Sequence, residues 1–306
     1  MDLIVIALGG NALLAPSGKQ SFSRENRNVD RVSKSIARLC KRSNYNVVVT
    51  HGNGSQVGDE LLRNEHAKSY VPKLPLYVLN AETQAQIGAV VETSLANSLG
   101  SAGVRRDVCV ILAHVLVDEK DPAFMKPSKP IGPYYTENEL QVELKFGRFS
   151  YTKLDGGYRK VVASPAPKEI IEIGAIRREV EKGIIITCGG GGVPVVRRHG
   201  KISGIDAVID KDLTTQLLAT QIGAEKIVIL TDADYVYSDH QKRRGPIREI
   251  KAKDLKKRLK TFEEGTIRPK IDACIRFIEN GGKDAYIGNV FELEDILKGK
   301  VGTRIY

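Results

Sequence analysis

The stretch at residues 5–16, "VIALGGNALLAP", decides how this sequence folds, because an apolar run stops there at two glycines and an asparagine. A short apolar run predicts a buried strand, and the glycines after it predict a tight turn. The chain repeats this arrangement twice more. Gly52, Asn53 and Gly54 follow the apolar run in "VVVTHGNGSQVG", and four glycines at 189–192 follow the run in "IIITCGGGGVPVV".

If the three strands run parallel in one sheet, their carboxyl ends meet at one edge, where open α/β sheets bind ligands. Backbone amides in such turns can surround phosphate oxygens without hindrance from side chains. Tight turns alone would also account for the glycines. Neither GxGxxG at the first crossover helix nor GxxxxGK[ST] occurs in the chain, so a dinucleotide fold and a P-loop are not supported.

Apolar runs and helix-like segments alternate along the chain, which predicts parallel strands joined by crossover helices. The expected strands are residues 3–8, 46–51, 108–117, 183–187, 226–230 and 285–288. The expected helices are residues 28–42, 56–68, 82–99, 168–181, 211–221, 254–260 and 270–279. We therefore expect an α/β fold in which helices cover both faces of a mainly parallel sheet.

One interval, residues 119–168, interrupts the alternation and is rich in proline, glycine and tyrosine. It is longer than an ordinary connection, and long insertions in compact domains usually form lids or small subdomains. We predict a subdomain inserted in the main fold. A passive surface insertion is the alternative, because lengthening a loop costs little closure entropy.

The composition is that of an ordinary folded protein, with 306 residues of which 42% are hydrophobic and 27% charged. No apolar stretch approaches the roughly 18 residues of a membrane span, and the start does not resemble a signal peptide. The four cysteines lie far apart, without a CxxC motif or a histidine at metal-site spacing. We expect a cytoplasmic protein with free thiols, no metal site of its own and no membrane partner.

The net charge is +10, and basic residues concentrate at 242–260, "KRRGPIREIKAKDLKKRLK". Such a stretch could bind nucleic acid, but no aromatic residue is interleaved to stack on bases. We favour a solvated helix face near an anionic small molecule and expect no nucleic-acid partner. The positive charge suggests an anionic substrate.

Three lysines lie in motif-like surroundings, Lys129 in "SKPIGPYY", Lys211 in "AVIDKDL" and Lys270 in "TIRPKIDACIRF". Phosphoryl transfer requires mainly positioned cations and backbone amides, because negative charge spreads over the transferred group. Lysines combined with glycine turns therefore indicate a phosphoryl-transfer site. Ordinary solvated lysines are the alternative at each position.

At this point the chain resembles carbamate kinase, within the amino acid kinase superfamily. The resemblance covers essentially the whole chain, in the family's order, through "ALGGNALL", "VVVTHGNGSQVG", "AETQAQIG", "SKPIGPYYTE", "KVVASPAPKEI", "CGGGGVPVV", "AVIDKDL", "TDADYVY" and "PKIDACIRF". Ser55 departs from the family, which usually has proline there. Because a helix should begin at this point, we expect that serine could cap it.

The resemblance implies a three-layer α/β/α sandwich whose N-terminal half binds the phosphoryl acceptor and whose C-terminal half binds ATP. Residues 119–168 would form a small subdomain that protrudes over the acceptor site. The reaction would be reversible transfer between ATP and carbamate, giving ADP and carbamoyl phosphate, with Mg²⁺ arriving on the nucleotide. The acceptor and the transferred group would be bound by Gly9, Gly10, Asn11, Gly52, Asn53 and Gly54.

The resemblance assigns catalytic roles to lysines and one carboxylate. Lys211 would stabilise the transferred group, and Asp212 would orient the lysines. Lys129 would reach down from the subdomain, although Lys126 lies nearby in the sequence. Other superfamily members carry a lysine where this chain has Ala7, so Lys211 would supply the missing cation. The attacking oxygen of carbamate is already anionic, so no general base is expected.

On the nucleotide side, the resemblance assigns Lys270, Asp232, Asp234, Tyr237, Gly189 and Gly190. It also implies a homodimer, with residues 82–99 as a contact region, although a core helix would show the same periodicity. Two rivals remain: a superfamily kinase that acts on acetylglutamate or an isoprenoid phosphate, and a non-catalytic nucleotide-sensing or nucleic-acid-binding module. Ala7 and the insertion disfavour the first, and the retained lysines disfavour the second.

Overall fold

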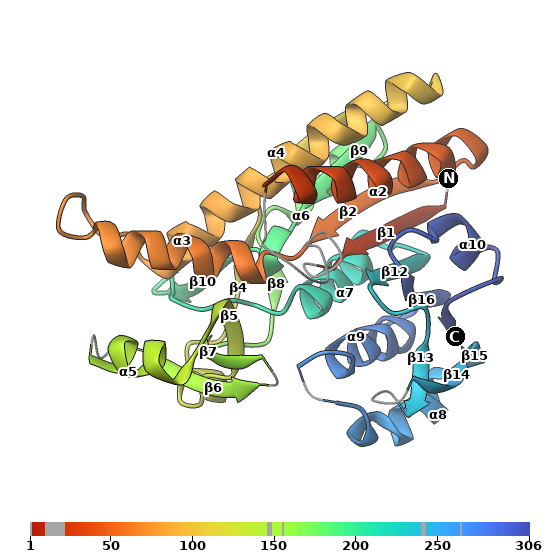
Figure 1. The fold of residues 1–306 in the computed structure, drawn as a ribbon. Helices are drawn as coiled ribbons and strands as arrows, with labels where there is room; N and C mark the ends of the chain where they lie inside the picture. The colour runs from red at the N-terminus through yellow and green to blue at the C-terminus, as the bar shows by residue number, and fades with distance from the viewer. Residues whose placement is uncertain (1, 10–21, 146–148, 155, 240–242, 264) are drawn as a thin grey trace.

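The computed structural model describes residues 2–9, 22–145, 149–154, 156–239, 243–263 and 265–306. Among these residues, the largest sheet has eight strands in the order β15-β17-β16-β12-β1-β2-β9-β3 (Figure 1). Neighbouring strands from β16 to β3 are parallel, whereas β17 runs antiparallel to β16. The strands are β1 (Leu3–Leu8), β2 (Asn46–His51), β3 (Asp107–Ile111), β9 (Gly183–Thr187), β12 (Lys226–Thr231), β15 (Glu249–Ile250), β16 (Asp284–Asn289) and β17 (Thr303–Ile305).

Helices cover both faces of this sheet. Successive side chains of a strand point to opposite faces, so Ile4 and Ile6 of β1 enter one apolar core and Val5 enters the other. The first core is covered by α2 (Phe22–Arg42), α4 (Leu76–Ala102) and α10 (Leu293–Leu297). The second is covered by α6 (Ile173–Glu179), α7 (Lys211–Ile222), α8 (Ala252–Lys257) and α9 (Arg268–Glu279). The predicted three-layer α/β/α sandwich is confirmed.

Most predicted elements are found with shifted ends. The helices predicted to begin at residues 28 and 82 begin at Phe22 and Leu76. The helix predicted at 254–260 is divided between α8 and the 3₁₀ turn η3 (Leu259–Thr261). No helix in the described part of the chain is long and apolar enough to cross a membrane.

The single strand predicted at residues 108–117 is wrong. The chain leaves the large sheet after β3, and β4 (His114–Leu116) belongs to a second sheet. At the break, Ala113 N donates to Gln84 Oε1 (3.1 Å), and Gln84 Nε2 donates to Ala113 O (3.3 Å). Ala113 O also accepts from Val193 N of the second sheet (2.9 Å), so both the Gln84 side chain and this sheet bind the backbone at the change of sheet. The second sheet has the order β11-β10-β4-β8, with β8 (Glu169–Ile170), β10 (Val193–Arg198) and β11 (Lys201–Gly204).

The helix predicted at residues 168–181 is also wrong over its first part. Residues Glu169–Ile170 form β8, which pairs antiparallel with β4, and α6 begins only at Ile173. Lys168 N donates to Leu116 O at 2.8 Å, which begins this pairing. The backbone groups are satisfied by another part of the chain, so tertiary pairing prevails over the local helical pattern.

Residues 119–168 contain a small sheet of their own, in the order β5-β7-β6, which lies apart from the large sheet in Figure 1. Its elements are η1 (Pro122–Phe124), β5 (Lys129–Tyr135), α5 (Glu137–Lys145), β6 (Ser150–Leu154) and β7 (Gly157–Val162). Ile131 and Val162 of this subdomain are buried against Val57 and Leu61 of α3 (Gly54–Ala67). The subdomain therefore rests on α3 through a separate apolar cluster.

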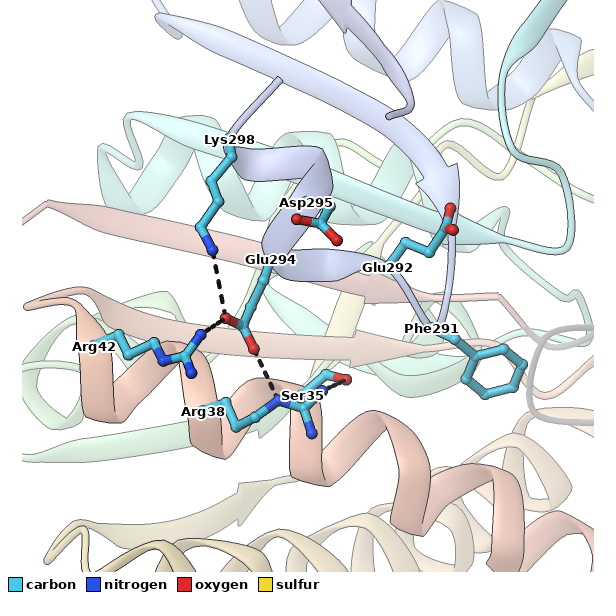
Figure 2. Close-up of a pocket in the computed structure, with 8 residues that line it drawn as sticks. All are labelled: Ser35, Arg38, Arg42, Phe291, Glu292, Glu294, Asp295 and Lys298. Atoms are coloured by element: carbon cyan, nitrogen blue, oxygen red, sulfur yellow. Dashed lines mark hydrogen bonds and ion pairs between the residues drawn. The ribbon is translucent and has the colours of Figure 1, made fainter. Parts of the chain in front are cut away.

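A polar pocket lies between α2 and α10 (Figure 2). In it, Glu294 pairs with Arg38 Nε (2.8 Å), Arg42 Nη1 (2.6 Å) and Lys298 Nζ (3.8 Å). The pairs with Arg38 and Arg42 join α10 to α2, whereas the pair with Lys298 lies within the end of α10. None of the residues predicted for the functional site lines this pocket.

Candidate active site

Gly9 and Gly52, which directly follow β1 and β2, lie at the carboxyl edge of the large sheet. Gly9 N donates to Leu230 O at 3.0 Å, and Gly52 N donates to Leu8 O at 3.1 Å. The parallel order β12-β1-β2 thus continues for one residue past the strands. Gly10 and Asn11, the other two candidates of the first turn, lie outside the described residues.

Asn53 ties the second turn to α4. Its Nδ2 donates to Asn80 Oδ1 (3.1 Å) and to Thr83 Oγ1 (2.9 Å), so the side chain does not cap α3. The positive end of α3 is therefore left without a side-chain acceptor from its N-cap residue, as an anion-binding turn requires. The expectation that Ser55 caps this helix is wrong, because α3 begins one residue earlier, at Gly54.

The third glycine turn, η2 (Gly189–Gly191), packs directly on the second. A Cβ atom on Gly189 would lie 2.3 Å from the His51 ring, and one on Gly190, whose φ is +64°, would lie 2.2 Å from Asn53 Nδ2. Close packing therefore accounts for glycine at both positions. Their contact with a nucleotide stays a prediction.

His51 is enclosed by these turns and does not act as a charged group. Burial lowers the pKa of His51 to about 4, and its Nδ1 lies 3.2 Å from Gly52 O. The ring is neutral at physiological pH and fills the space that Gly189 leaves open.

Three lysines from three elements meet two aspartates at the start of α7. Lys211 Nζ lies 2.5 Å from Asp212 Oδ1, and Lys270 Nζ of α9 lies 3.1 Å from Asp212 Oδ2. Lys129 Nζ of β5 lies 2.5 Å from Asp210 Oδ2. The structure therefore brings together the lysines predicted at distant points of the sequence, and Asp212 bridges two of them.

Burial and the neighbouring charges shift the pKa values of this cluster in opposite directions. Burial by itself would raise the pKa of Asp212, but the ammonium groups of Lys211 and Lys270 hold it well below its usual range. Burial would lower the pKa of Lys270, but Asp212 and then Asp210 raise it. For Lys211, burial prevails and lowers the pKa, although Asp212 opposes the shift. The side chain of Lys211 is 10% exposed and that of Asp212 is 3% exposed, so these charges interact with little screening.

Asp210 is the residue that the sequence analysis missed. Its Oδ1 accepts from Asp212 N (2.9 Å), which makes it the N-cap of α7, and its Oδ2 accepts from Lys129. Burial would raise the pKa of Asp210, but Lys129 lowers it. The sequence does indicate this residue, because an aspartate directly before the start of a predicted helix is a typical N-cap. One carboxylate thus connects the subdomain to the helix that carries Lys211.

Buried threonines hold α7 against the sheet. Thr215 Oγ1 donates to Lys211 O (2.7 Å) and also lies 2.7 Å from Thr50 Oγ1 of β2. Thr214 Oγ1 donates to Gly191 O at 3.0 Å. These contacts position the helix start, and hence Lys211, relative to two of the glycine turns.

The remaining nucleotide candidates do not all face the lysines. Asp232 is exposed at the end of β12 and is near enough to contribute to the raised pKa of Lys270. Asp234 accepts from Asn289 Nδ2 at 2.9 Å. Tyr237 lies in β13 (Val236–Asp239), paired with β14 (Arg244–Ile247), where its ring packs edge-on against Tyr235. Asp232 is therefore the member of this set nearest to the lysine cluster.

The donor set does not form a metal site by itself. Among the described residues, no three side chains of His, Cys, Asp or Glu gather closely enough to hold an ion. Asp210 and Asp212 are both paired with lysines. A nucleotide-bound Mg²⁺ would fit this arrangement, because its ligands would be mainly phosphate oxygens and water.

Comparison with known proteins identifies the family of this chain and its fold. The family model "Amino acid kinase family" matches residues 2–289. The carbamate kinase of Pyrococcus horikoshii is 41% identical over 312 residues, which cover 99% of each chain. The solved carbamate kinase of Giardia lamblia bound to citric acid is 36% identical, with a TM-score of 0.94 over 99% of this chain and 98% of that one. The same enzyme bound to AMP-PNP matches with a TM-score of 0.89, at 35% identity and the same coverage.

The chain therefore belongs to the amino acid kinase family and is an ATP-dependent kinase. Its full-length relatives place it among the carbamate kinases of that family.

We predict that Lys211→Met lowers kcat for phosphoryl transfer by roughly 100-fold or more, because a buried ammonium that binds the transferred group would act mainly in the transition state. Nucleotide affinity, measured by calorimetry, should change little. Circular dichroism checks that the variant is folded. Near-normal turnover in the folded variant would disprove the assignment.

We predict that Asp210→Asn lowers kcat only, whereas Asp210→Ala lowers both kcat and the free energy of unfolding. Asparagine can still accept from Asp212 N but presents an amide donor to Lys129, so it should keep stability while kcat falls about 10-fold. Alanine also removes the helix cap and should lower the free energy of unfolding by about 1 kcal/mol more. Denaturant unfolding and steady-state kinetics measure the two effects. Equal kinetics for wild type and Asp210→Asn would contradict the proposed link.

Proposed function

We propose that this kinase transfers a phosphoryl group reversibly between ATP and carbamate, giving ADP and carbamoyl phosphate. The observation that carries the proposal is the cluster of Lys129, Lys211 and Lys270 around Asp210 and Asp212. The helix that begins with Lys211 contacts Thr50 of β2 and the glycine turn at Gly191. Three ammonium groups against two carboxylates leave one excess positive charge there for an anionic group. The names of the full-length relatives support carbamate as the acceptor.

In this mechanism, the carbamate oxygen forms a bond to the γ-phosphorus while the bond to the leaving ADP oxygen breaks. Lys211 and Lys270 approach the transferred group from α7 and α9, and Lys129 approaches it from the subdomain. Asp212 holds two of these ammonium groups in place before substrate binds, so little reorganisation is needed during the reaction. Gly52 N bonds to Leu8 O, so the amides that follow it in the turn at Gly52–Gly54 would bind oxygens of the acceptor.

No proton acceptor is required, and the two buried aspartates are poorly suited to be one. Both have lowered pKa values, Asp210 because of Lys129 and Asp212 because of Lys211 and Lys270. Carboxylates of low pKa are weak bases. An acceptor whose attacking oxygen is already an anion avoids this difficulty, and carbamate is such an acceptor.

The nucleotide would lie toward Lys270 and Asp232, at the ends of α9 and β12. The AMP-PNP complex of the Giardia carbamate kinase supports a nucleotide site in a chain of this fold. Magnesium would enter with the nucleotide and neutralise part of the phosphate charge. Residues 119–168 would act as a lid over the acceptor, because β5 brings Lys129 to the cluster.

We also propose a homodimer formed through α4. The outward face of this helix carries exposed Ala85, Ala89 and Ala96 together with Glu82 and Gln86, and β3 beside it is an edge strand of the large sheet among the described residues. A flat face of this kind allows two helices to approach closely, and an open edge needs a cover. A cytoplasmic location agrees with the four free thiols.

The purified protein with Mg²⁺ and ADP should make ATP rapidly from carbamoyl phosphate, because the lysine cluster supplies positive charge for an acceptor whose attacking oxygen is already anionic. It should show at most traces of turnover with ATP and acetylglutamate or isopentenyl phosphate. A luciferase assay measures the ATP, and an enzyme-free control removes the spontaneous breakdown of carbamoyl phosphate. Robust use of acetylglutamate, or no ATP from carbamoyl phosphate, would favour a different acceptor.

The dimer predicts a solution mass of twice 33.6 kDa in light scattering. Ala89→Arg, which places a charge on the outward face of α4, should shift the mass toward the monomer. Lys298→Arg, on the distant α10 side, serves as the control and should leave the mass unchanged. A monomeric wild type at micromolar concentration would rule out this interface.

A further inference from the structure

The subdomain and α3 touch backbone to backbone at one point. A Cβ atom on Gly58 would lie 2.0 Å from Gly132 N and 2.1 Å from Gly132 Cα. Real Cβ atoms essentially never approach another heavy atom closer than 3.0 Å. Gly132, with φ of +70°, lies on the β5 side of this contact, since its own Cβ would lie 3.3 Å from Gly58 Cα. We call the contact between Gly58 and Gly132 the crossing. Any side chain at residue 58 would therefore push β5 away by about 1 Å or more.

This crossing lies close to the lysine that the subdomain supplies. Lys129 precedes Gly132 by three residues in β5, which corresponds to about 10 Å along a strand. Between them, Ile131 is fully buried in the apolar cluster on α3. The segment between the crossing and Lys129 is therefore held at both ends, by Gly132 on α3 and by the Lys129–Asp210 ion pair.

A backbone hydrogen bond connects the end of β7 to the segment that leads into α7. Val208 N donates to Ala163 O at 2.9 Å, just beyond β7 and two residues before Asp210. Ser128 N donates to Val162 O at 3.2 Å, beside Lys129. These bonds join the Lys129 end of β5 to the segment that leads to Asp210, while the contact between Gly132 and Gly58 sets the distance between the other end of β5 and α3.

We propose that Gly58 is a positioning residue for phosphoryl transfer: its missing side chain lets β5 sit close enough on α3 for Lys129 to reach Asp210 and the transferred group. The inference rests on the proposed function and concerns the same site. Gly58 touches no substrate and acts through Lys129. A displacement of about 1 Å in a group that stabilises the transition state can cost up to about 100-fold in rate.

The test is Gly58→Ala in the full-length enzyme, assayed by ATP formation from carbamoyl phosphate. We expect KM for carbamoyl phosphate to rise and kcat to fall, each by roughly 10-fold, with ADP affinity changed less than about 2-fold. Gly100→Ala is the matched control, because Gly100 is also inside a helix but has open space around it. Kinetics of Gly58→Ala equal to those of Gly100→Ala would overturn the proposal.

A second variant covers the possibility that Gly58→Ala does not fold. Gly132→Ala places a smaller obstruction at the same crossing, and we expect the same direction of change, with a few-fold rise in KM for carbamoyl phosphate. Gly103→Ala is its control, since Gly103 has φ of +71° with nothing within 4 Å of an added Cβ. Equal kinetics for these two variants would also contradict the inference.

A double variant distinguishes positioning of Lys129 from a displacement of α3 itself. In a Lys129→Met background, Gly58→Ala should add less than about 2-fold, because the group that it misplaces is already absent. An undiminished 10-fold effect in that background would mean that Gly58 acts through the turn at Asn53 instead, and the proposal would fail. A wild type that makes no ATP from carbamoyl phosphate would count against the proposed function, not against the crossing.

Discussion

Two ammonium groups, Lys211 and Lys270, are buried on either side of one carboxylate, Asp212, and the rest of the site is arranged to keep these charges compensated. Like charges in a poorly solvated environment repel strongly unless an opposite charge lies between them. Asp212 is 3% exposed and contacts both. The cluster therefore holds two cations close together around a buried carboxylate, whose lowered pKa makes it a weak proton acceptor.

The surrounding fold holds these charged side chains in place. Asp210 caps α7 and so orients the helix turn from which Lys211 and Asp212 project. The same carboxylate receives Lys129 from a subdomain that stands outside the main sheet. The large sheet supports the site, because the parallel strands β12, β1 and β2 end at one edge and α7 contacts Thr50 of β2 and Gly191 of the third glycine turn. The His51 ring contacts Gly189, so the end of β2 packs closely against the third glycine turn.

Secondary structure could be predicted where the local sequence pattern matches the burial of the element in the folded protein. The β-branched runs at 3–8, 46–51 and 183–187 are strands with those same bounds, since they are buried on both faces of the sheet. Prediction failed where another part of the chain supplied the hydrogen bonds. The run at 108–117 breaks because the Gln84 side chain bonds to Ala113, and the helix expected at 168–181 loses its start to pairing with β4.

The sequence by itself determined the fold class, the glycine turns and the three lysines, because strand-end glycines and lysines in short motifs are local features. Only the tertiary structure decided which charges meet. Lys129 and Asp210 are 81 residues apart, and Lys270 and Asp212 are 58 apart, so no local pattern links them. The same holds for Gly58 and Gly132, whose contact depends on how closely β5 lies on α3. Such pairings follow from the packing of whole elements, which sums many weak apolar contacts from the entire chain.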